Sequence, residues 1–299
     1  MKVSVIVPVE NEEYKVQNII EHILEQKVSF NYEIVVIDNN SIDNTALIVR
    51  NLSTNYPNVV IVENKKELNY NQIRNQGLHL AKGKYVTFYN QNSYWRRNKL
   101  QKQVNNLDKH NKSVLCFSNI ALIDNDKGII GNHFLKYPFF RKMINGRKTS
   151  QVCKNIFDVI IKENLIDFDN ILIRKEPLLK KGGFDENLNK DQDWDIWLKM
   201  AKNYKFSFNN EILMDKELFG ENTFNEKTVL NILEKYKKEC NPRTYSIAKS
   251  NCYAYIADEL FFLNKKKESF KYYLKSLKAF FQIRVFKEFM FKLAWVQNF

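Results

Sequence analysis

Residues 74–95, RNQGLHLAKGKYVTFYNQNSYW, decide the fold because they predict a helix, a tight turn and a buried strand in direct succession. The pair Lys82-Gly83 is a typical helix stop signal, and residues 85–88 are all strand formers. Four polar side chains, residues 90–93, then follow the strand. Ligands of open α/β sheets bind beyond the carboxyl ends of the strands. We therefore expect a binding site where this strand ends.

Strand and helix patterns alternate through the first part of the chain. Short apolar runs rich in β-branched residues at 2–8, 32–37 and 59–63 are typical of buried parallel strands. Helical spacing of apolar residues and N-capping residue types occupy the segments between these runs. The alternation predicts an α/β fold with a Rossmann-like, doubly wound and mostly parallel sheet.

The pattern weakens at residues 131–155, which we interpret as a loop over the cleft. After residue 219 the alternation stops, and helical patterns follow one another as far as residue 296. We therefore expect an α/β domain over residues 1–220 and a C-terminal α-helical appendage over residues 221–299. The appendage is expected to contain one tetratricopeptide-like helical hairpin and a final basic amphipathic helix at residues 283–296.

Composition limits the class of protein. The chain has 299 residues, 44% of them hydrophobic, and a formal net charge of +13. This content supports a folded core and excludes general disorder. Residues 221–299 hold 15 Lys/Arg against 8 Asp/Glu, a net charge of +7. A basic tail can meet nucleic acid or an anionic membrane, but no nucleic-acid recognition motif is present, so we expect no nucleic-acid partner.

The four cysteines form no C-x-x-C pair, which indicates free thiols in a reducing compartment. The sequence opens on a strand pattern and contains no apolar run of roughly 18 residues, so we expect a cytoplasmic protein. The final helix mixes aromatic and basic residues. It suits peripheral binding to the inner face of the cytoplasmic membrane, or packing on the hairpin or on a second subunit in a homodimer.

Four segments, taken in order, carry a resemblance to a known family. They are the opening VSVIVPVENEE, the strand end VVIDNNSIDNT, the stretch RNQGLHLAKGKYVTFYNQNSYWRRNKL, and GGFDENLNKDQDWDIWLKMA. Together they resemble the family 2 inverting glycosyltransferases with the GT-A fold. The resemblance covers residues 1–220. Each segment alone is a weak indication, whereas four segments in this order and spacing are specific.

The resemblance implies a nucleotide-sugar donor across the strand ends and a carboxylate that deprotonates the acceptor hydroxyl. It gives Asp193 the role of catalytic base and places Trp194 on the acceptor side, although an acidic helix start also explains an aspartate here. It also implies donor-site positions at the strand ends and in the following helix. These positions are Pro8, Glu10, Asp38, Asn39, Arg74, Asn90, Gln91 and Asn92.

The sequence departs from the family pattern at the metal site. The family holds a divalent ion with an Asp-any-Asp motif, but residues 90–92 are Asn-Gln-Asn here. Amide oxygens bring no charge, so Asn92 is a poor ligand, and Mg²⁺ or Mn²⁺ is expected to be weakly bound or dispensable. Donor phosphates could carry the ion in, or cationic side chains such as Arg96 and Arg97 could replace it.

The leading interpretation is inverting transfer of a sugar to a hydroxyl of a bacterial surface glycan or its lipid-linked precursor. The runner-up is a catalytically silent glycosyltransferase-like module that binds nucleotide, glycan or a partner enzyme. The amide substitutions favour the silent module, whereas the retained Asp193 favours the enzyme.

Overall fold

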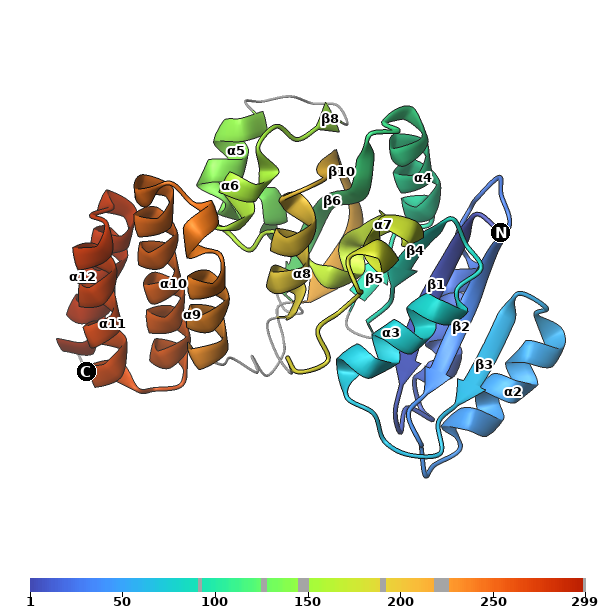
Figure 1. The fold of residues 1–299 in the computed structure, drawn as a ribbon. Coiled ribbons are helices and arrows are strands. Elements are labelled where there is room, and N and C mark those ends of the chain that lie inside the picture. Colours follow the sequence, from blue (N-terminus) through green and yellow to red (C-terminus); the bar gives the residue numbers. More distant parts are fainter. Residues whose placement is uncertain (91–92, 125–127, 145–150, 189–191, 218–225, 298–299) are drawn as a thin grey trace. The chain divides into compact units, whose positions relative to one another are not determined.

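The computed structural model describes residues 1–90, 93–124, 128–144, 151–188, 192–217 and 226–297 (Figure 1). The chain forms two compact units. The first comprises Met1–Ile156 and Leu165–Phe219, and the second comprises Phe157–Asn164 and Gly220–Phe299.

The first unit is built on one mixed sheet, which has ten strands within the described residues. Eight of them follow the order β3-β2-β1-β4-β9-β6-β10-β5, while β7 pairs with β6 and β8 pairs with β10. The strands are β1 (Val3–Val9), β2 (Tyr32–Asp38), β3 (Val59–Glu63), β4 (Tyr85–Phe88), β5 (Ser93–Trp95), β6 (Ser113–Asp124), β7 (Gly128–Asn132), β8 (Gln151–Val152), β9 (Ile171–Arg174) and β10 (Lys205–Glu217).

Six of the ten described strands run in the same direction, namely β1, β2, β3, β4, β6 and β10. Strands β3, β2, β1 and β4 run parallel to one another, as do β6 and β10. Strand β9 is antiparallel to both of its neighbours, and β5 is antiparallel to β10. The predicted α/β fold with a mostly parallel sheet is confirmed.

The order of the strands reverses at β1. The chain moves from β1 to β2 and β3 on one side, and then returns to pair β4 with the other side of β1. The register places Val9 beside Asp38 and Ile6 beside Phe88, so the carboxyl ends of β1, β2 and β4 share one edge. A reversal of this kind leaves a crevice at that edge, where ligands of such sheets bind.

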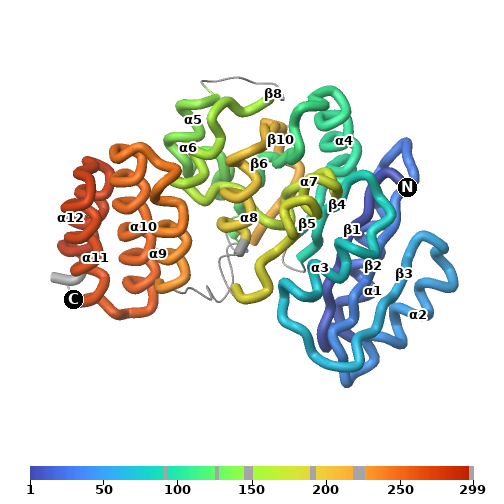
Figure 2. Tube along the Cα trace, viewed as in Figure 1, coloured from blue at the N-terminus to red at the C-terminus, as the bar shows by residue number. Residues whose placement is uncertain are grey.

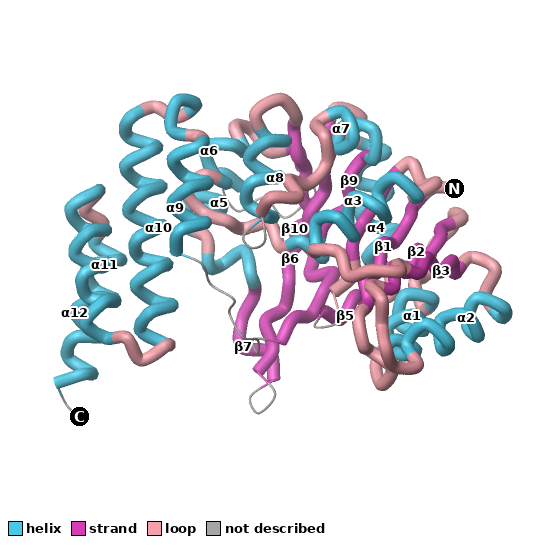
Figure 3. Tube along the Cα trace, turned by 60° about the horizontal axis from the view of Figure 1, so that its bottom comes forward, coloured by secondary structure: helices cyan, strands magenta, loops and turns pink. Residues whose placement is uncertain are grey.

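Helices cover the sheet (Figure 3). Helices α1 and α2 contact each other, whereas α3 contacts β1 and β2 on the opposite face, because right-handed crossovers in opposite directions use opposite faces. The helices of this unit are α1 (Val16–Leu24), α2 (Thr45–Asn55), α3 (Tyr70–Leu80), α4 (Lys99–Lys109), α5 (Pro138–Ile144), α7 (Lys175–Lys180) and α8 (Gln192–Ala201), with 3-10 turns η1 (His133–Lys136) and η2 (Phe168–Asn170).

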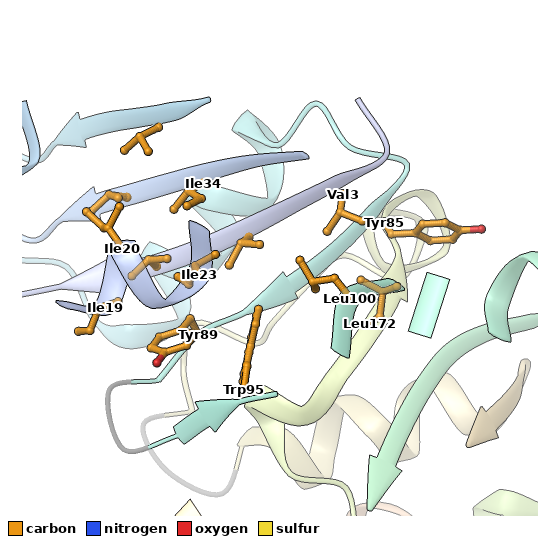
Figure 4. Packing of buried hydrophobic residues seen from close by; sticks show 14 of the residues in the cluster. Val3, Ile19, Ile20, Ile23, Ile34, Tyr85, Tyr89, Trp95, Leu100 and Leu172 are labelled. Atoms are coloured by element: carbon orange, nitrogen blue, oxygen red, sulfur yellow. The ribbon is translucent and has the colours of Figure 1, made fainter. Parts of the chain in front are cut away.

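A continuous apolar core joins α1 and α4 to the central strands (Figure 4). Ile20 and Ile23 of α1 are fully buried against it. The rings of Tyr89 and Trp95 meet with their centroids 5.0 Å apart, just beyond β4. Each buried side chain of this size contributes about 1.5–3 kcal/mol, so the core fixes the strand ends firmly.

Helix α3 approaches the sheet closely because Gly77 faces β1. A Cβ atom at this position would lie 2.5 Å from Cγ2 of Ile6, which is itself fully buried. The helix begins with a capping box, in which the Asn69 side chain accepts from the backbone N–H of Asn71 and Gln72. The capping box therefore fixes the first residue of α3, and the contact of Gly77 with Ile6 fixes the position of the helix on the sheet.

The second unit is an array of helices (Figure 2). Its elements are most of α6 (Ile156–Ile160), then α9 (Glu226–Lys235), the 3-10 turn η3 (Lys237–Glu239), α10 (Pro242–Phe262), α11 (Lys266–Ala279) and α12 (Ile283–Gln297). Helices α10 and α11 form the predicted tight hairpin. Asn264 turns the chain between them with a φ of 60°, and Ser269 Oγ donates to the Ala257 carbonyl at 2.7 Å.

The structure differs from the sequence prediction in one region and adds two strands. Residues 131–155, expected to form a loop, contain the end of β7, then η1, α5 and β8. Strands β5 and β10 are not predicted by the sequence. The first has only three residues, and the second carries a register shift between Asn209 and Ile212 that breaks the period-two pattern.

We predict that Gly77→Ala lowers the free energy of unfolding by roughly 1 kcal/mol. Overpacking against Ile6 costs about 1–3 kcal/mol, which outweighs the gain of at most about 1 kcal/mol from replacing a helical glycine. Urea denaturation followed by tryptophan fluorescence measures the change. Gly131→Ala is the matched control, because a Cβ there meets nothing within 4 Å. A Gly77→Ala variant as stable as the wild type would contradict the close packing of α3.

Candidate functional site

A cavity of about 480 Å³, here called the strand-end cavity, opens at the carboxyl ends of β1 and β4. This volume lies in the range of small-molecule sites. The position is the one expected from the reversal of strand order. The lining residues are Val7, Pro8, Val9, Glu10, Glu12, Ile19, Asn39, Glu67, Leu68, Asn69, Tyr70, Ile73, Arg74, Phe88, Tyr89, Asn90, Asp167, Phe168, Asp169, Asp193 and Lys216.

Six residues that the sequence analysis assigns to the site line this cavity: Pro8, Glu10, Asn39, Arg74, Asn90 and Asp193. Asp38 and Trp194 are buried and do not line it. Gln91 and Asn92 lie outside the described residues. The roles given to all ten residues stay predictions, and the structure places six of them at one cavity.

Arg74 and Asp193 meet across the cavity. The Arg74 guanidinium lies 3.7 Å from the centroid of the Phe168 ring, and its Nη1 lies 3.6 Å from Asp193 Oδ1. Asp193 stands in the first turn of α8. Burial raises the pKa of Asp193, while the positive charge of Arg74 opposes the rise. A carboxylate with a raised pKa is a stronger base, so Asp193 is suited to accept a proton.

Amide side chains of α3 hold the segment that leads into α8. Asn75 donates from Nδ2 to the Phe184 carbonyl at 3.0 Å and accepts from the Phe184 N–H at 2.9 Å. Asn71 donates to the Leu188 carbonyl at 3.0 Å. Gly183 has a φ of +63°, and a Cβ there would lie 2.5 Å from Asn75 Oδ1. These contacts hold residues 184–188, which precede α8 and Asp193 in the chain, against α3, the helix that carries Arg74.

Asn39 connects two other parts of the cavity wall. Its Nδ2 donates to Glu10 Oε2 at 2.6 Å and to the Leu68 carbonyl at 3.1 Å, and its Oδ1 accepts from the Leu68 N–H. Asp38, one residue earlier, accepts from the Ser41 N–H at 3.2 Å. Asn39 thus orders the wall, and Asp38 orders the turn after β2.

Five charged residues that the sequence analysis does not assign also line the cavity: Glu12, Glu67, Asp167, Asp169 and Lys216. The last three interact with one another or through Ser93. Asp167-Phe168-Asp169 has the Asp-any-Asp spacing and stands directly before strand β9. That spacing is the signal by which the two aspartates could have been found. Lys216 belongs to β10, whose irregular pattern conceals it.

The two aspartates of this group, Asp167 and Asp169, differ in their tendency to ionise. Lys216 Nζ lies 2.5 Å from Asp167 Oδ2, and Ser93 Oγ donates to Asp169 Oδ2. Burial favours the neutral acid at Asp167, but Lys216 outweighs it and lowers the pKa of Asp167. Burial and the charge of Asp167 raise the pKa of Asp169 well above its ordinary value. Asp167 is therefore the ionised member of the pair, and Asp169 retains its proton more strongly.

Arg96 and Arg97 do not supply cations to the cavity, which corrects the sequence prediction. Arg96 Nη2 lies 2.9 Å from Asp215 Oδ1, and Arg97 Nε lies 3.2 Å from Glu25 Oε2. Neither arginine lines the cavity. Ion pairs outside the cavity therefore engage both side chains.

The described side chains do not form a typical site for a divalent metal. In the part of the chain that the structure describes, no three carboxylate, imidazole or thiol groups are placed to hold an ion. Asn90 offers only an amide oxygen. Asp167 forms an ion pair with Lys216, and Asp169 accepts a hydrogen bond from the Ser93 hydroxyl. Mg²⁺ and Mn²⁺ prefer anionic oxygen ligands, and the two aspartates with the Asp-any-Asp spacing are engaged by these partners.

Comparison with known proteins decides the family. The family described as Glycosyl transferase family 2 matches residues 4–168, more than half of the chain. The chain belongs to this family. An uncharacterised glycosyltransferase of Methanocaldococcus jannaschii is 27% identical over 216 residues, which cover 71% of this chain and 69% of the relative. The UDP-Glc:alpha-D-GlcNAc-diphosphoundecaprenol beta-1,3-glucosyltransferase WfgD of Escherichia coli is 30% identical over 129 residues, covering 43% of this chain and 49% of WfgD.

Solved structures share the fold. Residues 1–349 of Staphylococcus aureus TarS, in complex with UDP, give a TM-score of 0.66 at 19% identity and cover 95% of this chain and 82% of that one. The mannosyltransferase PcManGT from Pyrobaculum calidifontis, in complex with GDP-Man and Mn²⁺, gives a TM-score of 0.59 at 16% identity. The match covers 99% of this chain and 80% of PcManGT. Identity this low shows the fold alone. The predicted GT-A-like fold and the predicted family are both confirmed.

We predict opposite effects from two neighbouring substitutions in the cavity. Asp167→Asn should lower the free energy of unfolding at pH 7 by roughly 1–3 kcal/mol, because it leaves Lys216 without its counter-charge. Asp169→Asn should be neutral or stabilising at pH 7, because an amide resembles the protonated acid. Urea denaturation between pH 4 and pH 8 measures both variants.

The direction of each pKa shift determines how the free energy of unfolding changes with pH. Lys216 lowers the pKa of Asp167, so the stability from this pair is present above the unfolded pKa and is lost as the pH falls through the folded pKa. The pKa of Asp169 is raised, so the wild type loses stability as the pH rises from the unfolded towards the folded pKa. The same sign for both variants at pH 7 would contradict this assignment of charges.

Proposed function

We propose that this chain transfers a sugar from a nucleotide-sugar donor to a hydroxyl of a bacterial surface glycan or its lipid-linked precursor, with inversion at the anomeric carbon. The observation that carries the proposal is the basic carboxylate of Asp193, which faces Arg74 in the strand-end cavity of a family 2 domain. The names of WfgD, whose acceptor is a diphosphoundecaprenol, and of TarS bound to UDP support the substrate class.

The proposed chemistry is one in-line displacement. The acceptor hydroxyl oxygen forms a bond with the anomeric carbon as its proton passes to an Asp193 carboxylate oxygen. The bond between that carbon and the β-phosphate oxygen breaks, and its electron pair leaves with the nucleoside diphosphate. Attack from the face opposite the leaving group inverts the anomeric configuration.

The proposed donor site follows the described wall of the cavity. Pro8, Glu10 and Asn39 line the side formed by β1 and β2, which suits the nucleoside. Arg74 and Asn90 line the side nearer Asp193, which suits the phosphates and the sugar. Because the amide at Asn90 brings no charge, we also propose that a divalent metal is weakly bound or dispensable.

We predict that Asp193→Asn lowers the rate of sugar transfer by about 10²–10⁴-fold, which is the contribution typical of general base catalysis. Donor affinity should change little, since the base acts on the acceptor. The measurements are the turnover of a donor and the binding of the matching nucleoside diphosphate by calorimetry. Glu211→Gln is a control, because Glu211 is exposed and its Oε2 lies 3.1 Å from Lys102 Nζ, outside the cavity.

Two results would contradict the proposal in different ways. Turnover of Asp193→Asn within a few-fold of the wild type would remove Asp193 from the role of base. A wild-type chain that binds nucleotide but transfers no sugar to any glycan or lipid-linked acceptor would favour the catalytically silent binding module.

Helix α12 has one face packed on its own unit and another exposed. Val285 is fully buried, and the ring of Phe289 lies 5.5 Å from that of Tyr273. Lys292 forms an ion pair with Asp258 of α10. The exposed apolar residues, here called the outer stripe, are Ile283, Phe286, Met290, Phe291 and Trp295. Within the described chain, the helices lack the combined length and apolarity needed to cross a bilayer.

We propose that the outer stripe binds peripherally to anionic membrane, and we predict sedimentation with anionic vesicles that weakens as salt rises. Phe286→Ser combined with Phe291→Ser should reduce vesicle binding by about tenfold or more, because two large apolar side chains are lost. Leu274→Ser is the control, since Leu274 is an exposed apolar residue of α11. Equal vesicle binding by the double variant and the control would exclude the outer stripe as the contact.

A further inference from the structure

We propose that Lys216 is the cation that contacts the donor diphosphate, in place of a divalent ion for which residues 90–92 offer no carboxylate. The inference rests on the proposed function, because it assigns a residue to the donor site of that reaction. Four observations lead to it: the position of Lys216, its free hydrogen-bonding capacity, the charge of the cavity, and the anchoring role of Asp167.

Lys216 lies opposite Ser93 and shares the strand-end cavity with Asn90, the described residues that flank positions 91 and 92 in the sequence. The antiparallel register of β5 and β10 pairs Lys216 directly with Ser93. Residues paired in this way have Cα atoms about 4.5–5.5 Å apart. Lys216 and Asn90 both line the strand-end cavity. An ammonium group on β10 and the amide of Asn90 thus both face the strand-end cavity.

The ammonium of Lys216 is anchored and still has donors to offer. Its Nζ donates to Asp167 Oδ2 at 2.5 Å, its only hydrogen bond to the residues that the structure describes. One third of the side chain remains exposed. An ammonium group carries three N–H donors, so two are left for a ligand in the cavity. Asp167 restricts the position of the ammonium without using up its donors.

The charge of the cavity makes a cation necessary for an anionic ligand. Six carboxyl groups line the described cavity against two cations, Arg74 and Lys216, and one of the six, Asp169, holds its proton more strongly than the others. The other five are Glu10, Glu12, Glu67, Asp167 and Asp193. Arg74 already faces Asp193 and stacks on Phe168. Lys216 is also paired, but 33% of its side chain is exposed against 15% for Arg74. It is therefore the cation better placed to donate charged hydrogen bonds to an anionic ligand.

In the proposed transfer, Lys216 acts on the leaving group. As the bond between the anomeric carbon and the β-phosphate oxygen breaks, its electron pair adds negative charge to that phosphate. The ammonium N–H groups donate to the phosphate oxygens and stay protonated throughout. Lys216 thus stabilises charge that grows during the reaction, and Asp193 removes the acceptor proton.

Two alternative arrangements of the Lys216–Asp167 pair predict different binding results. In one, Lys216 only neutralises Asp167 and keeps the wall folded. In the second, a divalent ion brought in with the donor displaces the ammonium and binds Asp167 and Asp169. The first predicts that removing both members of the pair leaves diphosphate binding intact, and the second predicts that binding requires metal.

The experiment is calorimetric titration of the full chain with UDP and GDP, compared with uridine and guanosine, in EDTA and again with Mn²⁺. We expect the wild type to bind one diphosphate in EDTA. Lys216→Met should weaken this binding by about 10- to 100-fold, as expected for a hydrogen bond from a charged group, while leaving nucleoside binding unchanged. Lys216→Arg should retain the affinity within a few-fold.

A double variant separates recognition from folding. Lys216→Met combined with Asp167→Asn removes the pair without leaving a buried charge, so it should fold as judged by thermal melting. We expect it to bind diphosphate as weakly as Lys216→Met alone. Restored binding in the double variant would overturn the proposal in favour of a structural countercharge.

Arg96→Met is the matched control, because Arg96 joins β5 to the neighbouring Asp215 of β10 by an ion pair outside the cavity. It should leave diphosphate affinity unchanged. Binding that disappears in EDTA and returns with Mn²⁺, equally in the wild type and in Lys216→Met, would assign the role to a metal. A wild type that binds none of the nucleotides in either condition would overturn the proposed function, and this inference with it.

Discussion

Charge buried at the carboxyl edge of the sheet must be paired, and this constraint shapes the site. An ion removed from water without a partner costs several kcal/mol even after the protein relaxes. Arg74 therefore faces Asp193, and Lys216 faces Asp167. Asp169 accepts a hydrogen bond from the Ser93 hydroxyl. Its pKa is raised, so it holds its proton more tightly than an ordinary aspartate. The chemistry available to the cavity follows from these three arrangements.

The fold brings the paired groups together from distant parts of the chain. Gly77 lets α3 approach β1 closely, and Asn71 and Asn75 of the same helix hold the segment that leads into α8. Helix α3 thus carries Arg74 and also holds the residues that precede α8, the helix of Asp193. The second pair uses different elements, since Asp167 precedes η2 and β9, and Lys216 lies near the end of β10. The cavity is therefore supported by two independent connections.

Sequence patterns reveal the parts of the structure that depend on local periodicity. The apolar runs at 2–8, 32–37 and 59–63 become β1, β2 and β3, because buried parallel strands carry continuous apolar sequence. Arg74 and Asp193 are also found from the sequence, since the family resemblance covers their segments. Lys216 and Asp167 are not, because they stand 49 residues apart and only tertiary pairing brings them together. The bulge in β10 removes the alternation that would have shown the strand.

Exchanging a bound ion for an attached ammonium changes the energetics of a donor site. A divalent ion brings two positive charges, but it must be recruited, and its affinity depends on a cluster of anionic ligands that the described residues do not form. An ammonium brings one charge, yet it is part of the chain and Asp167 holds it in place before the donor arrives. Preorganised charge needs little rearrangement during the reaction, which compensates for its smaller size. The same Asp167 carboxylate would compete with the donor phosphates for the ammonium. A donor site built in this way therefore has to balance anchoring against release, and the one-third exposure of Lys216 leaves its remaining donors accessible for that exchange.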